Sequence, residues 1–194
     1  ADLKEKGYNV LATGEMGIGN TTTSSAVCSV LLDQSVEKVT GKGAGLTNKD
    51  LEHKIEVIRQ SIALNKVNAD DPLDVLAKVG GLDIAGMAGC YIGGAALNIP
   101  VFIDGFISSV AALIAIRLVP ECAPYLFPSH CSNEPAGRMI LDAIGKQPYI
   151  FANMCLGEGT GAVMGFTIAD YAFKAYWELP SFEQTNFGTY EELN

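Results

Sequence analysis

Residues 14–23 of the chain read Gly-Glu-Met-Gly-Ile-Gly-Asn-Thr-Thr-Thr, and this loop decides how the rest of the sequence is interpreted. An extended apolar run, Tyr8–Ala12, leads into the loop, and a helix-like run, Ser24–Leu32, leads out of it. Glycines let backbone N–H groups approach a ligand closely, and the N-terminus of a helix carries partial positive charge. A strand, a glycine turn and a helix in this order therefore predict an anion-binding site.

Glu15 is unusual in such a loop, because a carboxylate repels a phosphate. We therefore expect Glu15 to hold a sugar hydroxyl or to accept a proton. The alternative is a strand-to-helix turn that binds nothing and is capped by Asn20 or Thr21. The loop by itself leaves both interpretations open.

Composition narrows the class of protein. The 194 residues suit one domain, with or without a small annex, and a hydrophobic fraction of 48% is enough for a large core. The net charge is −9 without any basic run, which argues against nucleic acid or an anionic membrane surface as a partner. The uncharged stretch from Ile84 to Ile103 contains glycines and Pro100, so it predicts a buried helix and a buried strand rather than a membrane span.

The chain has five cysteines, an odd number, and no two of them have CxxC spacing. Cys28, Cys90 and Cys155 lie in apolar runs, which predicts reduced, buried thiols in a cytoplasmic protein. Neither histidine has ligand-spaced partners, so we expect no zinc site and no other bound metal. The N-terminal residues, Ala1–Lys6, do not resemble a signal peptide.

Short apolar runs alternate with helical runs along the chain. The predicted strands are Tyr8–Thr13, Val36–Thr40, Val101–Asp104, Tyr125–Pro128 and Pro148–Asn153. The predicted helices are Asn20–Leu32, Asn48–Asn65, a run from Asp71-Pro72 to Gly80-Gly81, Leu82–Leu97, Phe106–Leu118, Ala136–Gly145 and Ala162–Trp177. This alternation predicts a doubly wound α/β fold, Rossmann-like, with a mainly parallel sheet and helices on both faces.

Ligands of such sheets bind at the carboxyl ends of the strands, where this sequence places Glu15, Asp104, Ser132 and Glu158. We expect Glu158 to be poorly solvated, which would raise its pKa toward that of a general base. A position at a helix N-terminus would have the opposite effect. Asp104 could contact a ligand or cap the following helix. His130 beside Ser129 and Ser132 does not predict a hydrolase, because no GxSxG motif is present.

Two glycine pairs, Gly17/Gly19 and Gly43/Gly45, predict a phosphate cradle, for which Lys54 could supply the counter-charge. The Walker pattern and a complete GxGxxG motif are both absent, so a nucleoside triphosphatase or a nicotinamide oxidoreductase is disfavoured. The residues around Lys54 favour a solvated position on an exposed helix over a ligand contact.

These segments, in this order, resemble the nicotinate-nucleotide:dimethylbenzimidazole phosphoribosyltransferase family of cobalamin (cobamide) biosynthesis. The matching segments are Gly14–Thr22, Gly41–Gly45, Asp71-Pro72, Gly80-Gly81 with Asp83-Ile84-Ala85, Asp104–Ser108, His130 with Ser132 and Glu134, and Leu156–Gly161. The resemblance implies a homodimeric, doubly wound α/β protein with a small second domain. It also implies transfer of 5-phosphoribose from nicotinate mononucleotide to a benzimidazole-type base, without a metal or cofactor.

The resemblance also implies roles for individual residues. Glu158 resembles the family's general base, and Glu15 the supporting carboxylate near the ribose. Residues that resemble contacts to the phosphoribose are Gly17, Gly43, Lys54, Gly105, Ser132 and Gly157. Met16 and Leu156 resemble walls of the base pocket.

Family chains are longer at the N-terminus, so we expect the small domain to be largely absent from this chain. Residues 1–178 are assigned to the α/β core, and residues 179–194 to a C-terminal tail that could belong to the small domain. An alternative function is a truncated, non-catalytic module that binds a nucleotide or ribazole phosphate. A structural or assembly partner is a third possibility, suggested by the glycine-rich helix Leu82–Leu97.

Overall fold

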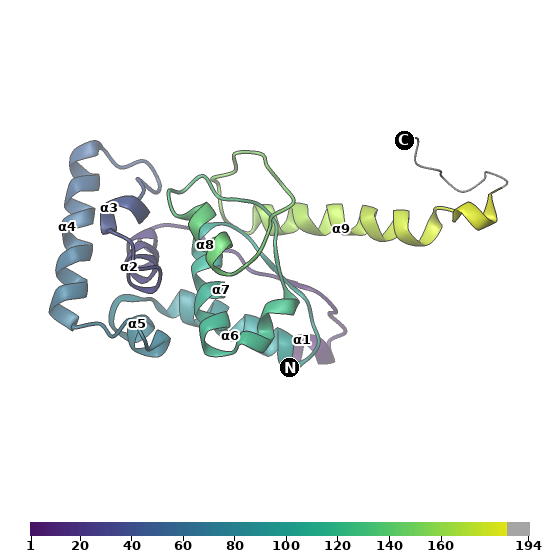
Figure 1. Cartoon of the computed structure of the whole chain (residues 1–194), viewed down its shortest axis with the longest axis horizontal. Helices are drawn as coiled ribbons and strands as arrows, with labels where there is room; N and C mark the ends of the chain where they lie inside the picture. The colour runs from purple at the N-terminus through teal and green to yellow at the C-terminus, as the bar shows by residue number, and fades with distance from the viewer. Residues whose placement is uncertain (186–194) are drawn as a thin grey trace, which may run out of the picture.

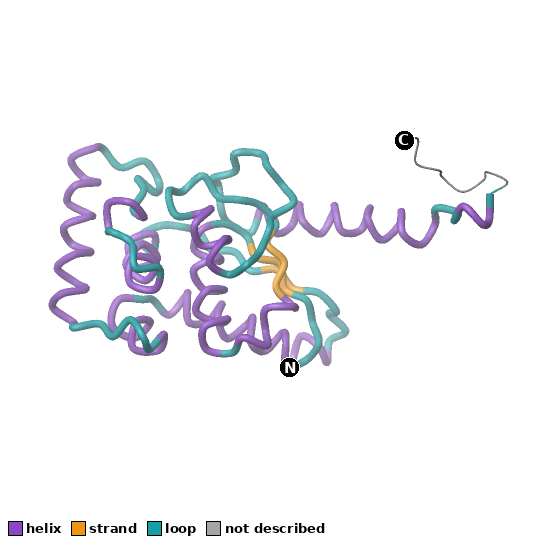
Figure 2. Tube along the Cα trace, viewed as in Figure 1, coloured by secondary structure: helices purple, strands orange, loops and turns teal. Residues whose placement is uncertain are grey.

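The computed structural model of the chain describes residues 1–185, and at its centre lies a parallel three-stranded sheet. The strand order is β1 (Leu11–Ala12), β2 (Val101–Ile103) and β3 (Leu126–Pro128). Figure 2 shows the strands in orange, surrounded by helices and loops. Leu11 pairs with Val101, which in turn pairs with Leu126, so all three strands run in one direction. Their carboxyl ends therefore meet at one edge of the sheet.

Helices cover both faces of this sheet, as predicted. Successive side chains of a strand point to opposite faces. Val101 packs so closely on Gly94 of α6 (Leu82–Ala96) that an added Cβ would lie 2.5 Å from its Cγ2. Phe102 packs in the same way on Gly165 of α9 (Thr160–Glu178), at 2.9 Å from its Cδ1. The two glycines thus allow one helix to approach each face.

The core lies around α7 (Phe106–Leu118), whose residues from Phe106 to Ala115 are all buried. The helices that pack against α7 are α2 (Thr21–Leu31), α5 (Pro72–Val79), α6 and α8 (Gly137–Ala143). Outside them, α4 (Asn48–Asn65) forms the end of the molecule opposite α9 (Figure 1). The remaining elements are α1 (Asp2–Glu5), α3 (Val36–Val39) and the 3-10 turns η1 (Pro120–Tyr125) and η2 (Phe182–Gln184).

Local signals explain where several helices begin. The Asp71 carboxylate accepts hydrogen bonds from the backbone N–H groups of Leu73 and Asp74, and Pro72 follows at the first helical position of α5. Thr47 caps α4 by accepting from the N–H of Asp50. These caps account for the agreement between the predicted and observed beginnings of both helices.

Three of the predicted strands are wrong or too long. Val36–Thr40 is not a strand, because Val36 and Val39 are both buried on one side of the single turn α3, and Thr40 closes that turn by donating to the carbonyl of Val36. Pro148–Asn153 makes only one bridge, between Ile150 and His130. The first strand is two residues long rather than spanning Tyr8–Thr13, and Tyr8 is 56% exposed.

At the end of the described chain, α9 extends away from the rest of the molecule (Figure 1). Large exposed apolar side chains occur along it and just beyond: Val163, Met164, Ile168, Tyr171, Phe173, Tyr176, Trp177, Leu179 and Phe182. The helix ends at Glu178, but the division into a core and a tail stays a prediction, and residues 186–194 of that tail lie outside the described residues. None of the described helices combines the length and apolar character needed to cross a membrane.

Two cysteines, Cys90 and Cys155, are less buried than expected. Cys28 and Cys122 are buried and Cys90 is half-buried, whereas Cys155 is exposed. The prediction that Cys155 is buried is therefore wrong, because it lies in the loop before α9 rather than in a strand. All five thiols are free.

Candidate functional site

Two loops that each carry a glutamate lie against one another at the carboxyl edge of the sheet. The backbone N–H of Glu158 donates to the carbonyl oxygen of Glu15 at 2.9 Å. A Cβ on Gly14 would overlap the backbone of Gly159, so this contact requires a glycine at position 14. The fold therefore brings together the two glutamates that the sequence singled out.

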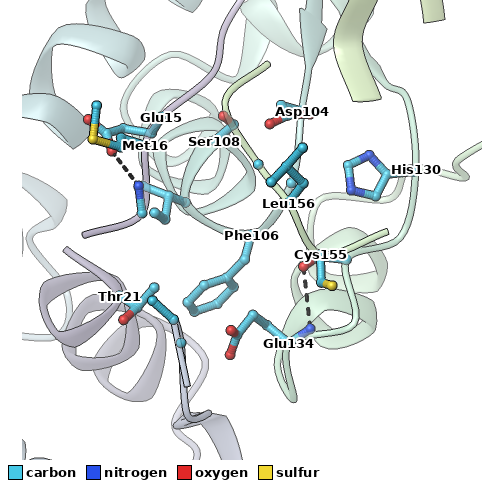
Figure 3. Close-up of a pocket in the computed structure, with 17 residues that line it drawn as sticks. Glu15, Met16, Thr21, Asp104, Phe106, Ser108, His130, Glu134, Cys155 and Leu156 are labelled. Atoms are coloured by element: carbon cyan, nitrogen blue, oxygen red, sulfur yellow. Dashed lines mark hydrogen bonds between the residues drawn. The ribbon is translucent and has the colours of Figure 1, made fainter. Parts of the chain in front are cut away.

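A pocket opens beside these loops, as Figure 3 shows. Its wall comes from the loops that follow the three strands, the start of α7, the glycine loop before α4 and the loop before α9. The lining residues are Glu15, Met16, Gly17, Thr21, Gly43, Ala44, Asp104, Gly105, Phe106, Ile107, Ser108, His130, Ser132, Glu134, Cys155, Leu156 and Gly157. Eight of the ten residues assigned to the site by resemblance lie in this wall, and the two that do not are Lys54 and Glu158.

Glu158 lines a second, more open depression. This depression is lined by Ala12, Thr13, Gly14, Glu15, Met16, Glu158, Gly159 and Val163. Glu15 and Met16 belong to both cavities, so the two glutamates lie where the cavities adjoin. Glu158 is exposed, and the expectation that it is poorly solvated is wrong for the described chain, because its loop lies at the surface.

Glu15 is held in place by its neighbours. Its Oε2 accepts hydrogen bonds from the backbone N–H of Gly17 at 2.9 Å and from Asn20 Nδ2 at 2.5 Å. Asn20 Nδ2 also donates to Asp83 Oδ2 at 2.8 Å. Asn20 precedes α2 but makes no side-chain capping bond, so it orients Glu15 rather than capping the helix.

Lys54 lies behind the wall of the pocket. Its side chain is only 6% exposed, and its Nζ donates to Thr21 Oγ1 at 2.9 Å and to the carbonyl of Gly41 at 3.0 Å. The interpretation of Lys54 as a solvated helix residue is therefore wrong. Thr21, which does line the pocket, is held by this buried ammonium group.

Lys54 and Glu134 form a charge pair at this end of the pocket. Burial lowers the pKa of Lys54, and the charge of Glu134 offsets part of that change. Burial raises the pKa of Glu134, and the charge of Lys54 opposes it. Of the two, Glu134 lines the pocket, and the Lys54 ammonium group behind the wall opposes its charge.

Asp104 caps a different helix from the one that its position in the sequence suggests. It is 2% exposed, and the helix that follows it, α7, has no side-chain cap. Instead its carboxylate accepts hydrogen bonds from Gly159, Gly161 and Ala162, at the start of α9. The first of these partners is 55 residues away in sequence, and no local pattern around Asp104 predicts it.

Next to Asp104 lies His130, which is 3% exposed and whose Nδ1 is 3.1 Å from Ser129 Oγ. Burial lowers the pKa of His130, although the nearby charge of Asp104 acts in the opposite direction. Burial therefore favours the neutral form of the ring. Thr21 and His130 are wall residues to which the sequence assigned no role in the site.

Metal-ligating side chains do not gather at the site. Among residues 1–185, no group of three or more His, Cys, Asp or Glu side chains is placed to hold a metal ion. The groups that the described site offers to a ligand are carboxylates, backbone N–H groups and hydroxyls, with one buried ammonium group behind the wall.

Residues 1–187 of the chain match the family model DBI_PRT, described as "Phosphoribosyltransferase". The chain is 53% identical over 191 residues to a protein of Ruminiclostridium cellulolyticum and 50% identical over 190 residues to one of Acetivibrio thermocellus. Both are named "Nicotinate-nucleotide--dimethylbenzimidazole phosphoribosyltransferase". The matches cover 98% of this chain but 54% of each relative, so the chain spans about half the length of the curated relatives it matches.

The fold agrees with these sequence comparisons. The crystal structure of CobT from Thermus thermophilus superimposes with a TM-score of 0.87 at 34% sequence identity. That match covers 94% of this chain and 54% of the CobT chain. By its sequence and its fold, the chain belongs to the phosphoribosyltransferase family that the DBI_PRT model describes.

Proposed function

We propose that the protein containing this chain transfers 5-phosphoribose from nicotinate mononucleotide to 5,6-dimethylbenzimidazole or a related base. The products are nicotinate and α-ribazole 5′-phosphate, a precursor of the nucleotide loop of cobalamin. The observation that carries this proposal is the backbone hydrogen bond that joins the Glu15 and Glu158 loops beside a pocket lined in part by glycines. The names of the relatives support the choice of substrates.

In this proposal the phosphoribose occupies the first pocket. Backbone N–H groups at Gly43, Gly105 and Gly157 approach the phosphate and the ribose, together with the hydroxyl group of Ser132. Gly17, whose own N–H is bound to Glu15, contributes a close backbone approach to the ligand. Lys54 contributes charge from behind the wall and fixes Thr21 rather than forming the wall itself. Met16 and Leu156 are 63% and 66% exposed, and we propose that they contact the flat face of the base.

The proposed reaction is a displacement at the anomeric carbon. The ring nitrogen of the acceptor base attacks C1′ from the face opposite nicotinate, which inverts that centre. The electron pair of the breaking C1′–N bond passes to the pyridine nitrogen, whose positive charge makes nicotinate a good leaving group. The proton of the attacking azole passes to Glu158, while Glu15 stabilises positive charge on the ribose.

Two further proposals follow from family membership. We propose a homodimer, which the exposed apolar side chains of α9 support, because a face of that kind favours association with another surface. We also propose a cytoplasmic location, supported by five free cysteines.

The test is to follow nicotinate release from nicotinate mononucleotide and 5,6-dimethylbenzimidazole with the complete protein. Glu158→Gln should lower kcat by at least about 100-fold while donor binding is kept, because the proton acceptor is lost. Glu52→Gln changes an exposed carboxylate on α4 and should leave kcat unchanged. Full activity of Glu158→Gln would exclude Glu158 as the base, and absence of nicotinate release by the unaltered protein would exclude the transferase.

One observation favours a second candidate, a non-catalytic module that binds a nucleotide or ribazole phosphate. Glu158 is exposed, so it lacks the desolvation that would suit a general base. This candidate predicts that calorimetry detects binding of nicotinate mononucleotide while no nicotinate is released. Turnover by the unaltered protein would exclude it.

A further inference from the structure

We propose that Asp104 is a positioning residue of the transferase site, which holds residues 157–161 in the conformation that presents Glu158. The inference rests on the function proposed above and assigns Asp104 an effect on the reaction that operates through Glu158. Asp104 lies directly after β2, on the element that supports the centre of the sheet. A rigid strand end is a suitable anchor for a loop that must be placed accurately.

Both carboxylate oxygens of Asp104 are committed to this loop. Oδ2 accepts from the N–H of Gly159 at 3.0 Å, and Oδ1 accepts from the N–H groups of Gly161 at 2.8 Å and Ala162 at 3.3 Å. The first N–H groups of a helix have no partner within the helix, and a negative charge at that end is favourable. Asp104 thus satisfies the start of α9 from a different part of the chain.

The loop that Asp104 holds has an unfavourable backbone. Three consecutive residues are left-handed, with φ of 77° at Gly157, 57° at Glu158 and 80° at Gly159. Glycine adopts this region freely, but a residue with a Cβ does so only at a cost in free energy. Glu158 therefore keeps its conformation only while the surrounding contacts impose it.

Hydrogen bonds impose that conformation from both sides of Glu158. Its own N–H is bound to the carbonyl of Glu15, and the next N–H, that of Gly159, is bound to Asp104. Packing adds a third restraint, since a Cβ on Gly161 would overlap the His130 ring and lie 2.8 Å from Asp104 Oδ1. The Glu158 backbone is thus fixed between the first glycine loop and the end of β2.

Loss of the Asp104 bonds would let Glu158 relax toward negative φ and turn its carboxylate away from the acceptor base. Gly157 lies in the loop that Asp104 holds, but the glycine wall around Gly17 and Gly43 does not depend on Asp104, so most contacts to the phosphoribose donor should be preserved. The inference therefore predicts a large fall in kcat with little change in KM for nicotinate mononucleotide.

The first test uses Asp104→Asn in the complete protein. The amide oxygen of asparagine can still accept from Gly161 and Ala162, but its NH₂ group then faces the N–H of Gly159, so one selected bond is lost. We expect kcat to fall by about 10- to 100-fold, with KM for nicotinate mononucleotide within about threefold of the unaltered value. Ser29→Ala removes a buried hydrogen bond to Gln34 far from the site and should change neither constant.

A double-mutant cycle separates positioning from a general loss of structure. If Asp104 acts through Glu158, Asp104→Asn should cause no further loss of kcat in a Glu158→Gln background. If the double variant lost kcat by the product of the two single losses, the proposal would be overturned. An unchanged kcat in Asp104→Asn alone would also overturn it.

Amide hydrogen exchange gives a readout that does not depend on turnover. Asp104→Asn should accelerate exchange at residues 157–162 by at least about tenfold, with the helix α7 unaffected. Unchanged exchange there would overturn the proposal even if the protein were not a transferase, whereas a transferase failure alone would leave the exchange result intact. Asp104→Ala removes all three bonds, and if that variant does not fold, the nearly isosteric asparagine variant still decides the question.

Discussion

The backbone N–H of Glu158 lies 2.9 Å from the carbonyl oxygen of Glu15, to which it donates a hydrogen bond. This bond joins a loop near the N-terminus to the loop that begins α9. The separation of the two loops is therefore set by main-chain atoms rather than by side-chain rotamers. Changes that push the two loops apart should therefore lower both activity and stability.

Gly14→Ala tests this backbone contact. The added Cβ would overlap the backbone of Gly159, so the Glu158 loop must shift. We expect kcat for nicotinate release to fall by about 100-fold. The free energy of unfolding, measured with urea, should fall by about 1–3 kcal/mol.

Gly86→Ala is the matched control for that substitution. Gly86 lies on α6 with no atom within 4 Å of an added Cβ, so alanine should stabilise the protein by about 0.5–1 kcal/mol without changing kcat. An active Gly14→Ala variant of normal stability would show that the two loops tolerate separation.

Asn20 should control the orientation of Glu15. Its Nδ2 donates to both Glu15 and Asp83, so Asn20→Asp would replace a shared donor with a third carboxylate. We expect kcat to fall and the free energy of unfolding to decrease by about 1–3 kcal/mol, since like charges approach and two acceptors lose their donor. Asn9→Asp, at an exposed position, should change neither quantity, and equal behaviour of the two variants would contradict the role of Asn20.

Lys54→Met should destabilise the wall of the pocket, although Lys54 does not itself line the pocket. The substitution leaves Thr21 Oγ1 and the Gly41 carbonyl without their donor and Glu134 without its counter-charge. We expect the free energy of unfolding to fall by about 1–3 kcal/mol and KM for nicotinate mononucleotide to rise. The exposed Lys49 on the same helix provides the control, because Lys49→Met should leave both unchanged.

His130 should make stability depend on pH. The pKa of His130 in the folded chain is lowered from its ordinary value of 6.5. At any pH between the folded-state pKa and 6.5, the unfolded chain therefore binds more protons than the folded one. Stability contributed by the neutral ring is thus present above pH 6.5 and is lost as the pH falls. The melting temperature should drop between about pH 7.5 and pH 5.5, and His130→Asn should reduce that drop.

The only other histidine, His53, is exposed on α4 and supplies the control. His53→Asn should leave the pH dependence of the melting temperature as it is in the unaltered protein. A His130→Asn variant with the full pH dependence would assign the effect to other groups.

The helices could be predicted well from the sequence because their signals are local. Asn48–Asn65 and Phe106–Leu118 are confirmed to the residue, since a cap or a glycine marks where each begins. The strands were predicted less well, because a strand exists only through its pairing with a distant segment. Val36–Thr40 is rich in β-branched residues, yet its two valines pack on one side of a helical turn.

Several wall residues of the candidate site could also be predicted, because glycine loops are a local signal in the sequence. The glycine loops mark Gly17, Gly43 and Gly105 as wall residues, and all three line the pocket. Burial and partners of charged groups depend on tertiary contacts, so the sequence misplaced Lys54 in solvent. For Asp104 the sequence left a ligand contact and a cap of the following helix both open, and the cap proves to be on α9 instead. The exposure of Glu158 likewise follows from the surface position of its loop, which depends on tertiary contacts.

The bond between Glu15 and Glu158 has a consequence for folding. A site assembled from segments this far apart in sequence carries a large loop-closure entropy and cannot form before the intervening elements have packed. Helical structure can appear early from local contacts, but the two glutamates meet only after the chain from β1 to α9 is in place. Recovery of activity after dilution from denaturant should therefore trail the recovery of helical circular dichroism, which makes activity a reporter of the last step of folding.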